Sequence, residues 1–301
     1  MLALIIPWLL ALLAVVSIVC LIRKRWKFAL FLVVVTLALN WWSGCFCFGN
    51  KTSYNGDFKI LSFNIDGADV YNDNKTESII SIINKENPDV IFLTENFMPI
   101  RDTILVRLHN MYPYDTRYMA HNIIFSKLPL FEKTFHERPN GGNGFIVHSK
   151  IIVNDTPLVL YGCHLSSNNY SSDLEYLTPR SIRSISDIKT YFDNISYASR
   201  MRRREADIVA QSFNESDNVI VMGDFNDICG SETMRTFSKV GLKDAWSEGG
   251  FGYGATIHTP IPYRIDHILY NEGLVLKGVK VIETSDISDH NALVAVFDFG
   301  N

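Results

Sequence analysis

Two long apolar segments near the N-terminus constrain this chain more than any other feature. Residues 2–22 are uncharged and nearly all apolar, and a second apolar stretch covers residues 28–46. A helix rises about 1.5 Å per residue, so about 20 apolar residues cross a bilayer core of about 30 Å. Because only residues 23–27 join the two segments, they can form only a helical hairpin. We predict that residues 1–48 are a membrane anchor of two transmembrane helices.

The connection between the two segments predicts the orientation of the hairpin. Residues 23–27 (RKRWK) carry four basic side chains, and residues 1–50 contain no Asp or Glu. Basic loops stay on the cytoplasmic side, so the domain after the hairpin is expected on the extracytoplasmic side. A cleaved signal peptide is the plainer alternative, but its basic residues should precede the apolar stretch. A lipoprotein-type cleavage site before Cys45 is a second alternative, in which Trp42 fits poorly.

The rest of the chain has the composition of an acidic globular domain. Residues 51–301 contain 24 Lys and Arg against 32 Asp and Glu, a net charge of −8. This composition excludes a disordered chain, a collagen-like repeat and a basic nucleic-acid coat protein. Five Cys in 301 residues are too sparse for a mini-protein built on disulfides. We predict a polar linker over 49–57 and one soluble domain over 58–301.

Strand and helix patterns alternate through this domain. Helical spacing of apolar residues occurs at 76–84 and at 180–213. Many strands with a few helices between them predict an α/β sandwich. Neither of the standard glycine-rich phosphate loops is present, which argues against the common nucleotide-binding folds. The predicted strands cover residues 59–64, 89–94, 122–126, 144–148, 158–163, 218–222, 264–270, 279–282 and 292–299.

Polar side chains recur where these strands end. Each one alone is explained by turn chemistry or by a cap. Together they indicate a pocket, because strand ends at one edge of a sheet converge. Carboxylate and amide oxygens suit Mg²⁺, whereas zinc is disfavoured because no Cys-x-x-Cys or His-x-x-x-His pair occurs. With histidines as proton carriers, this set suits attack of water on a phosphate ester. The residues are Asn64, Glu95, His164, Asp224, Asn226, Asp266, His267, Asp289 and His290.

The order of these motifs resembles the endonuclease/exonuclease/phosphatase superfamily, the DNase I-like metal-dependent phosphoesterases. The resemblance spans residues 59–299, essentially the whole soluble domain. It implies a four-layered α/β/β/α sandwich with the active site at one end of the two central sheets. The matching segments are LSFNIDG (61–67), PDVIFLTE (88–95), YGCHLSS (161–167), VIVMGDFND (219–227), RIDHILYN (264–271) and SDHNALVAVF (288–297).

The resemblance also implies a metal site. It makes Glu95 the main Mg²⁺ ligand, with Asn64 beside it and Asp289 in or near the metal shell; Mn²⁺ and Ca²⁺ are alternative ions. Thr94 departs from the family, which commonly has Gln at this position, and this should alter only the surroundings of the metal. His267 follows a motif carboxylate on a strand, so alternation points it away from the site, and we interpret it as structural.

The remaining motif residues are expected to carry the chemistry. The resemblance implies that Asp224 and Asn226 position the attacking water and a phosphoryl oxygen. It makes His290 the general base or a contact to the transition state, oriented by the carboxylate of Asp266. His164 is expected to contact the phosphate and to protonate the leaving group.

The sequence leaves the substrate open. Lys and Arg are needed to hold a nucleic-acid backbone, and Arg at 200 and 202–204 supply such a cluster, although a solvated helix face looks the same. We expect Arg203 and Arg264 to contact the substrate. The leading hypothesis is a nuclease-like phosphodiesterase. A phospholipid or sphingomyelin head-group phosphodiesterase is the first alternative. A tethered binding module without catalysis is the second, although the chain retains every motif acid and histidine.

Cys163 and Cys229 flank two of the motifs. An exported domain could join them in a disulfide, but strand alternation alone does not bring them within bonding distance. We therefore interpret both as small buried apolar residues.

Overall fold

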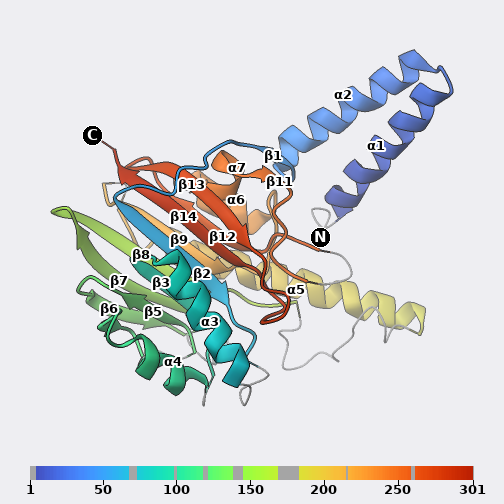
Figure 1. Cartoon of the computed structure of the whole chain (residues 1–301). Coiled ribbons are helices and arrows are strands. Elements are labelled where there is room, and N and C mark those ends of the chain that lie inside the picture. Colours follow the sequence, from blue (N-terminus) through green and yellow to red (C-terminus); the bar gives the residue numbers. More distant parts are fainter. Residues whose placement is uncertain are drawn as a thin grey trace.

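Two six-stranded sheets pack face to face, and helices cover their outer faces (Figure 1). The computed structural model describes residues 5–67, 73–97, 100–117, 121–137, 145–168, 183–214, 216–258 and 262–300. The predicted four-layered α/β/β/α sandwich is therefore confirmed.

Each sheet has one parallel pair of strands in an otherwise antiparallel order. The first sheet consists, in spatial order, of β10 (Lys243–Asp244), β12 (Asp266–Tyr270), β9 (Val219–Asp224), β8 (Thr156–His164), β7 (Ile146–Val153) and β6 (Phe131–His136). The second consists of β13 (Leu274–Ile282), β14 (Ala292–Phe299), β2 (Phe58–Asn64), β3 (Val90–Thr94), β5 (Ile123–Ser126) and β4 (Tyr114–Asp115). The parallel pairs are β8 with β9 and β2 with β3. Since parallel neighbours end at the same edge, these two pairs bring their final residues together.

The main hydrophobic core lies between the two sheets. Phe92 of β3 is fully buried there and faces the backbone of β8 and β9. A Cβ atom at Gly162 would lie 2.3 Å from the Phe92 ring, and one at Gly223 would lie 2.7 Å from it. Because glycine has no Cβ, these two positions let the sheets approach each other closely near the ends of β8 and β9.

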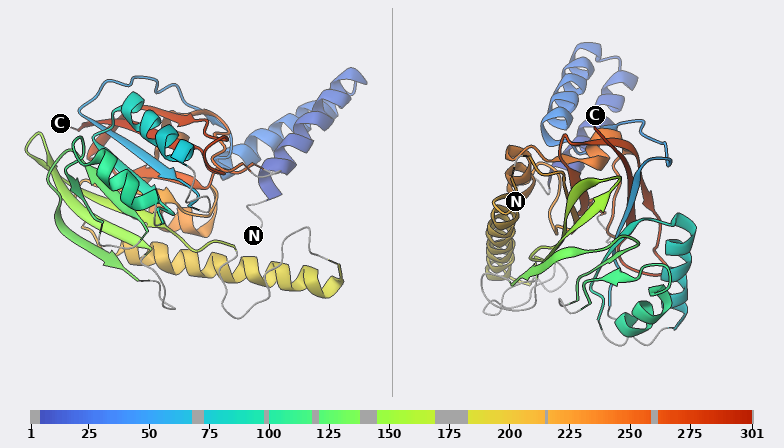
Figure 2. Two further views of the ribbon diagram at one scale, coloured as in Figure 1. Left: turned by 60° about the horizontal axis from the view of Figure 1, so that its bottom comes forward. Right: turned by 90° about the vertical axis from the view of Figure 1, so that its left-hand side faces the viewer.

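Amphipathic helices form the two outer layers. Ile79 and Ile83 of α3 (Asp73–Glu86) pack on the second sheet together with α4 (Ile100–Leu108). Ala206 and Val209 of α5 (Ile185–Ala210) pack on the first sheet, where α6 (Glu232–Lys239) also lies. The first turns of α5 extend beyond the sandwich (Figure 2). A short helix, α7 (Ala245–Gly249), directly follows β10, the edge strand of the first sheet.

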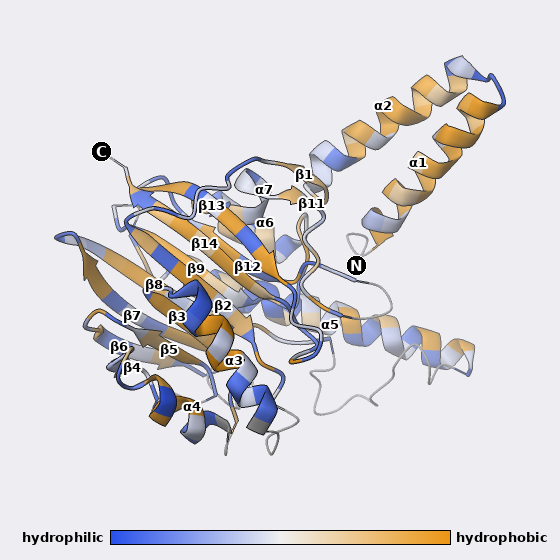
Figure 3. Ribbon diagram, in the orientation of Figure 1, coloured by the Kyte–Doolittle hydropathy of each residue, from blue (hydrophilic) through white to orange (hydrophobic). Residues whose placement is uncertain are grey.

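The N-terminal residues form two antiparallel helices that project from the sandwich (Figures 1 and 2). They are α1 (Ile6–Ile22) and α2 (Trp26–Ser43), and both are apolar along their length (Figure 3). Large apolar side chains face outward, such as Ile22 at 75% and Trp41 at 91% exposure. By length and composition α2 suffices to cross a bilayer, whereas α1, with 17 residues, is shorter.

The base of the helical hairpin packs against the sandwich. Ile6 and Leu10 of α1 form a small buried cluster with Cys45 and Cys229. The indole nitrogen of Trp8 donates a hydrogen bond to the hydroxyl of Tyr263 over 3.3 Å. The hairpin therefore contacts two loops of the domain rather than only the segment that follows it.

The segment expected as a linker is held against the domain. Before it, β1 (Cys47–Phe48) pairs with β11 (Phe251–Gly252) in an antiparallel bridge of two residues. Within it, the amide of Lys51 donates to the carbonyl of Gly249 over 3.0 Å, and the amide of Ser53 donates to that of Lys277 over 3.2 Å. Residues 49–57 thus follow the edge of β13.

The predicted elements differ from the observed ones mainly at their ends. Most of the predicted strands agree with the structure to within two residues, but those expected at 144–148 and 279–282 are Ile146–Val153 and Leu274–Ile282. The long helix begins at Ile185 instead of residue 180, and residues 180–182 lie outside the described part of the chain. β6, α4 and α6 were not predicted. All but one of the β6 side chains are exposed, so that strand lacks the apolar pattern on which such a prediction depends.

Candidate active site

Three neighbouring strands of the first sheet carry polar residues in one row at the same edge. His164 at the end of β8 lies opposite Asp224 at the end of β9. Asp224 in turn lies opposite Asp266 at the start of β12. Asp224 and Asp266 are each only 1% exposed, whereas the side chain of His164 is 19% exposed. The register of the sheet therefore places two buried carboxylates and a histidine side by side.

The second sheet contributes an amide and a carboxylate to the same place. Asn64 ends β2 beside Thr94 of β3, and Glu95 follows Thr94 with a positive φ of 56°. The side-chain amide of Asn64 donates to Glu95 Oε1 and to Asp224 Oδ2, both over 3.1 Å. A left-handed backbone is unfavourable for Glu, and it re-aims this side chain at the strand end. Asn64 therefore bridges the two sheets at the centre of the cluster.

His290 joins the cluster through a carboxylate partner. Its Nδ1 lies 2.8 Å from Asp266 Oδ2, and its Nε2 lies 3.8 Å from Asp224 Oδ2. The backbone before it is fixed by Ser288, whose hydroxyl donates to the carbonyl of Asn64 over 2.8 Å. The expected pairing of His290 with Asp266 is present in the geometry.

Asn226 lies in the turn that follows Asp224 and holds the Asp224 carboxylate in place. It has a φ of 51°, and its amide N–H donates to Asp224 Oδ1 over 2.8 Å. Its side-chain nitrogen donates to Asp224 Oδ2 over 3.2 Å and to the carbonyl of Leu165 over 3.0 Å. Asn226 therefore fixes the Asp224 carboxylate and the residue after His164 together.

Burial and mutual repulsion set the charges of the cluster. Burial raises the pKa of Glu95, and the nearby charge of Asp224 raises it further. Burial and the charge of Asp266 likewise raise the pKa of Asp224. Burial alone would lower the pKa of His290, but the charges of Asp266 and Asp224 outweigh it and raise the pKa to about 10. The cluster thus holds several carboxylates around the imidazolium of His290.

The donor set fits a divalent cation. Ligand atoms of Glu95, His164 and Asp224 lie within 4.8 Å of one another, as do those of Asp224, Asp266 and His290. Neighbouring carboxylates with raised pKa values are in an unfavourable state that a bound cation relieves. Carboxylate oxygens are the ligands that Mg²⁺ prefers, so Glu95 and Asp224 would hold such an ion.

Two expected metal ligands are placed differently from the others. Asn64 turns its nitrogen toward the carboxylates, while its oxygen accepts from the amide of Asp66 over 3.0 Å. In this arrangement Asn64 aligns the carboxylates and does not offer its oxygen to an ion. Asp289 lies at the rim with its side chain 56% exposed, and its Oδ1 is 3.9 Å from His290 Nε2.

The structure corrects the expectation that Arg264 contacts the substrate. Its side chain is fully buried, and its guanidinium forms an ion pair with Asp244. His267 is buried beside it, with Nδ1 2.8 Å from Asp244 Oδ2, as its structural interpretation predicted. Arg264 therefore has a role inside the fold and cannot reach a ligand. Arg203 of α5 is exposed, and its contact with the substrate stays a prediction.

Sequence reasoning missed the buried support under the His164 loop. Arg202, next to the exposed Arg203, is 2% exposed. Its guanidinium donates to the carbonyl of Ser166 over 2.9 Å and pairs with Asp227 over 3.3 Å. Ser166 also binds Glu205, another buried residue of α5. The run of arginines did not indicate that Arg202 would be buried. The only available signal was the spacing of Arg202 and Glu205, which lie about one helical turn apart and therefore on the same face of the helix.

The contrast between neighbouring arginines gives a direct test. Replacing Arg202 by Lys keeps the charge but loses the fork of hydrogen bonds, so we expect a loss of about 1–2 kcal/mol in unfolding free energy, measured with urea. Replacing exposed Arg203 by Ala should change stability by less than about 0.5 kcal/mol. If Arg203 holds the substrate, its replacement raises KM. Equal stability losses in both variants would contradict the difference in burial.

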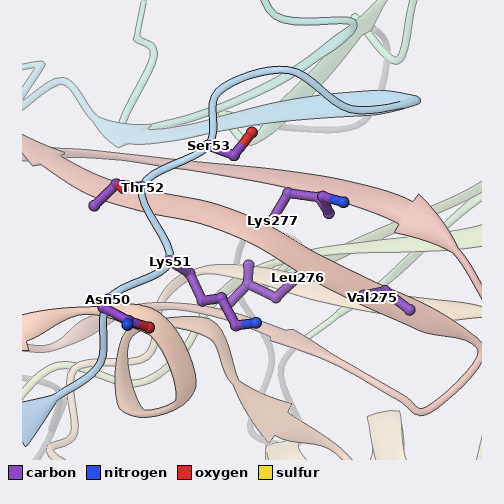
Figure 4. Close-up of a pocket in the computed structure, with 7 residues that line it drawn as sticks. All are labelled: Asn50, Lys51, Thr52, Ser53, Val275, Leu276 and Lys277. Carbon is purple, nitrogen blue, oxygen red and sulfur yellow. The ribbon is translucent and has the colours of Figure 1, made fainter.

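A surface hollow lies away from this cluster. It has a volume of about 340 Å³ and is lined by the linker segment and β13, including Lys51, Ser53 and Lys277 (Figure 4). None of its lining residues belongs to the strand-end cluster. The geometry of the carboxylates and histidines, and not the depth of a pocket, therefore identifies the candidate site.

A four-layered sandwich with carboxylates and histidines at the ends of both central sheets is the architecture of the DNase I-like class. The chain belongs to the endonuclease/exonuclease/phosphatase family, whose sequence model matches residues 61–290. Members of this family hydrolyse phosphoester bonds. The match begins at Leu61 of β2 and ends at His290, so it contains every predicted site residue.

Solved structures share the fold at low sequence identity. The protein SmcL is 18% identical with a TM-score of 0.60, covering 82% of this chain and 99% of its own. TDP2 from D. rerio, crystallised with a single-strand DNA product, is 17% identical with a TM-score of 0.58, covering 80% of this chain and 98% of its own. Beta toxin from Staphylococcus aureus is 17% identical with a TM-score of 0.54, covering 79% and 99%. No curated protein sequence matches this chain.

Proposed function

We propose that this chain is a membrane-anchored, Mg²⁺-dependent phosphodiesterase, and that its substrate is nucleic acid. One observation carries the proposal: Asn64 joins Glu95 of one sheet to Asp224 of the other, beside the His290–Asp266 pair. Carboxylates and a charged histidine around one point support this proposal, because phosphodiester hydrolysis needs a metal site and a group that stabilises charge. A bound divalent cation would polarise a phosphoryl oxygen and stabilise its developing charge.

The histidines are proposed to act on the two sides of the phosphate. With its pKa raised to about 10, His290 is an imidazolium at neutral pH. It is therefore better suited to donate a hydrogen bond to a phosphoryl oxygen than to remove a proton from water. The carboxylate of Asp224, held by Asn226, is then the group that orients the attacking water. His164, whose Nε2 lies 3.6 Å from Glu95 Oε1, is proposed to protonate the leaving oxygen.

Proton competition with the metal gives a test of the site. The pKa values of Glu95 and Asp224 are raised, so both carboxylates gain protons at a higher pH than usual. A metal binds only the deprotonated form, so activity should fall as pH decreases. Raising Mg²⁺ tenfold should move this acid limb to lower pH by about one unit if one proton is displaced. The measurement is kcat/KM against pH at two Mg²⁺ concentrations, with EDTA abolishing activity. If the pH of the acid limb does not change with the Mg²⁺ concentration, the metal does not bind at Glu95 and Asp224.

Support for a nucleic-acid substrate comes from charge and from a relative. Exposed arginines lie on α5 at positions Arg200, Arg203 and Arg204. Arg202, in the same run, contacts the loop after His164. TDP2 from D. rerio, which shares this fold, was crystallised with a single-strand DNA product. Arginine contacts to phosphates favour nucleic acid binding and make it weaken as salt rises.

A lipid head group is the second candidate, and one contact favours it. Trp8 of α1 binds Tyr263, and Tyr263 pairs with Ile257, which itself bridges to His290. The apolar hairpin thus contacts a loop that borders the site, so a bilayer around the hairpin would lie near that loop. The deciding experiment supplies full-length protein with DNA, RNA, bis-p-nitrophenyl phosphate and sphingomyelin vesicles. Cleavage of DNA or RNA supports the first candidate, and cleavage of only the lipid supports the second. No cleavage with any metal would refute both.

We further propose that α1 and α2 span the membrane and that the domain lies on the extracytoplasmic side. The outward apolar side chains of both helices support the membrane-spanning arrangement. The basic connection between the helices supports the orientation. Alkaline phosphatase fused after residue 55 reports the side directly, because it is active only when exported. An inactive fusion that is stably expressed would reverse the orientation.

A further inference from the structure

Two buried cysteines meet where the membrane hairpin joins the catalytic domain. The sulfur of Cys45, one residue after the cap of α2, lies 3.6 Å from the sulfur of Cys229. Cys45 is fully buried, and Cys229 is 6% exposed. They are 184 residues apart in sequence, so the fold alone brings them together.

The surroundings hold the two sulfurs in contact. Ile6 and Leu10 of α1 pack around the pair. Gly230, the next residue after Cys229, lies so close to α2 that a Cβ atom there would be 3.2 Å from the carbonyl oxygen of Ser43. Sulfur atoms at van der Waals distance need only a small shift to reach the bonded distance of about 2.05 Å.

We propose that Cys45 and Cys229 form a disulfide that joins the end of the membrane hairpin to the loop after β9. That loop follows Asp224, the last residue of β9, and includes Asn226, so the bond would tie the segment after the Asp224 carboxylate to the anchor. The other pairing considered from the sequence, Cys163 with Cys229, has no such support, because Cys163 lies in a separate core cluster beneath the first sheet.

The bond forms by thiol–disulfide exchange with an external disulfide, such as oxidised glutathione or a thiol oxidoreductase. One of the two cysteines attacks the oxidant as thiolate and releases one thiol. The other then attacks the sulfur of the first in this mixed disulfide and releases the second thiol. One oxidant disulfide is thus converted to two thiols for each protein disulfide. The hydrogen bond from Cys229 lowers the pKa of Cys45 to about 7, so Cys45 is the thiolate of the pair.

The test counts thiols in the full-length protein and does not depend on its hydrolytic activity. Reduced protein in detergent is incubated with oxidised glutathione, quenched with acid, denatured and labelled with a mass-tagged maleimide. The chain has five cysteines, so we expect five tags before oxidation and three after it, on Cys20, Cys47 and Cys163. Proteolysis and mass spectrometry should give one cross-linked species that contains Cys45 and Cys229. Five tags after oxidation, a lasting glutathione adduct, or a cross-link between other cysteines would overturn the proposal.

Two variants separate this pair from its neighbours. Cys45→Ser should leave no cross-linked peptide that contains Cys229. Cys47→Ala is the matched control, because Cys47 is also buried and lies two residues further along; its cross-link between Cys45 and Cys229 should still form. Closing a loop of this length should raise the melting temperature of the oxidised protein by roughly 5–15 °C. The melting temperature of Cys45→Ser should not respond to the oxidant, and a response equal to that of wild type would count against the bond.

Discussion

Replacing His290 by Ala is expected to lower kcat about 10³-fold, with the fold retained. His290 is held as an imidazolium by the carboxylates around it, and its Nε2 faces Asp224 and Asp289. Its removal takes away the group that would stabilise charge on a phosphoryl oxygen. The measurement is single-turnover hydrolysis at saturating Mg²⁺, with thermal melting to check that the variant is folded. His109→Ala, at an exposed histidine, is the control and should keep wild-type kcat.

Asp266→Asn tests how His290 obtains its charge. Asp266 is the leading cause of the raised pKa of His290 among the charges around it. A group with a raised pKa keeps its proton below that value and loses it as pH rises, so wild-type activity should fall above about pH 10. In Asp266→Asn this alkaline limb should move to lower pH. Wild-type kcat in His290→Ala, or an unmoved alkaline limb in Asp266→Asn, would mean that these roles are misassigned.

Asp244→Asn is expected to destabilise the domain by about 3–5 kcal/mol. Asp244 is the counter-ion of fully buried Arg264 and also binds His267. The neutral amide leaves the Arg264 charge buried without a partner, and that cost exceeds the value of the lost bond itself. Asn still caps α7 through its side-chain oxygen, so the variant isolates the charge. Urea denaturation at pH 7 measures the loss.

The pH dependence of stability distinguishes this charge from a packing effect. Burial alone would raise the pKa of Asp244, but the charges of Arg264 and His267 hold it well below its usual range. A depressed carboxyl pKa stabilises the fold above the unfolded value of about 3.9, and the gain is lost as pH falls through the folded value. The difference between wild type and Asp244→Asn should therefore shrink below about pH 4. Asp298→Asn, at a partly exposed pair with Lys277, should cost less than about 1 kcal/mol at any pH.

The strands that carry the site were predictable because their side chains follow simple rules. β2, β3 and β9 are buried at every position or nearly so, and such apolar runs are recognised without knowledge of partners. A polar residue directly after a buried run then indicates a strand end. Asn64, Glu95 and Asp224 were found in this way.

Contacts between distant segments were not predictable from the same patterns. Arg264 was expected to contact the substrate, but only the fold brings Asp244 to it, and arginines are rarely buried without such a partner. Arg202 and Arg203 are neighbours of the same type, yet the direction of the helix face buries one and exposes the other. The orientation of the Asn64 side-chain amide likewise depends on distant contacts. Its nitrogen donates to carboxylates of both sheets, and its oxygen accepts from the backbone of Asp66.

The ring of Phe92 acts as a spacer for the chemistry, although it touches no reacting group. It separates β3, which leads to Glu95, from the two glycine positions that precede His164 and Asp224. The gap between the two halves of the site is thus set by the thickness of one aromatic ring in the dry interior. Replacing Phe92 by a smaller residue, or either glycine by Ala, would lower the activity as a substitution of a proposed catalytic residue would. Loss of activity from this position should therefore be attributed to misaligned ligands and not to missing ones.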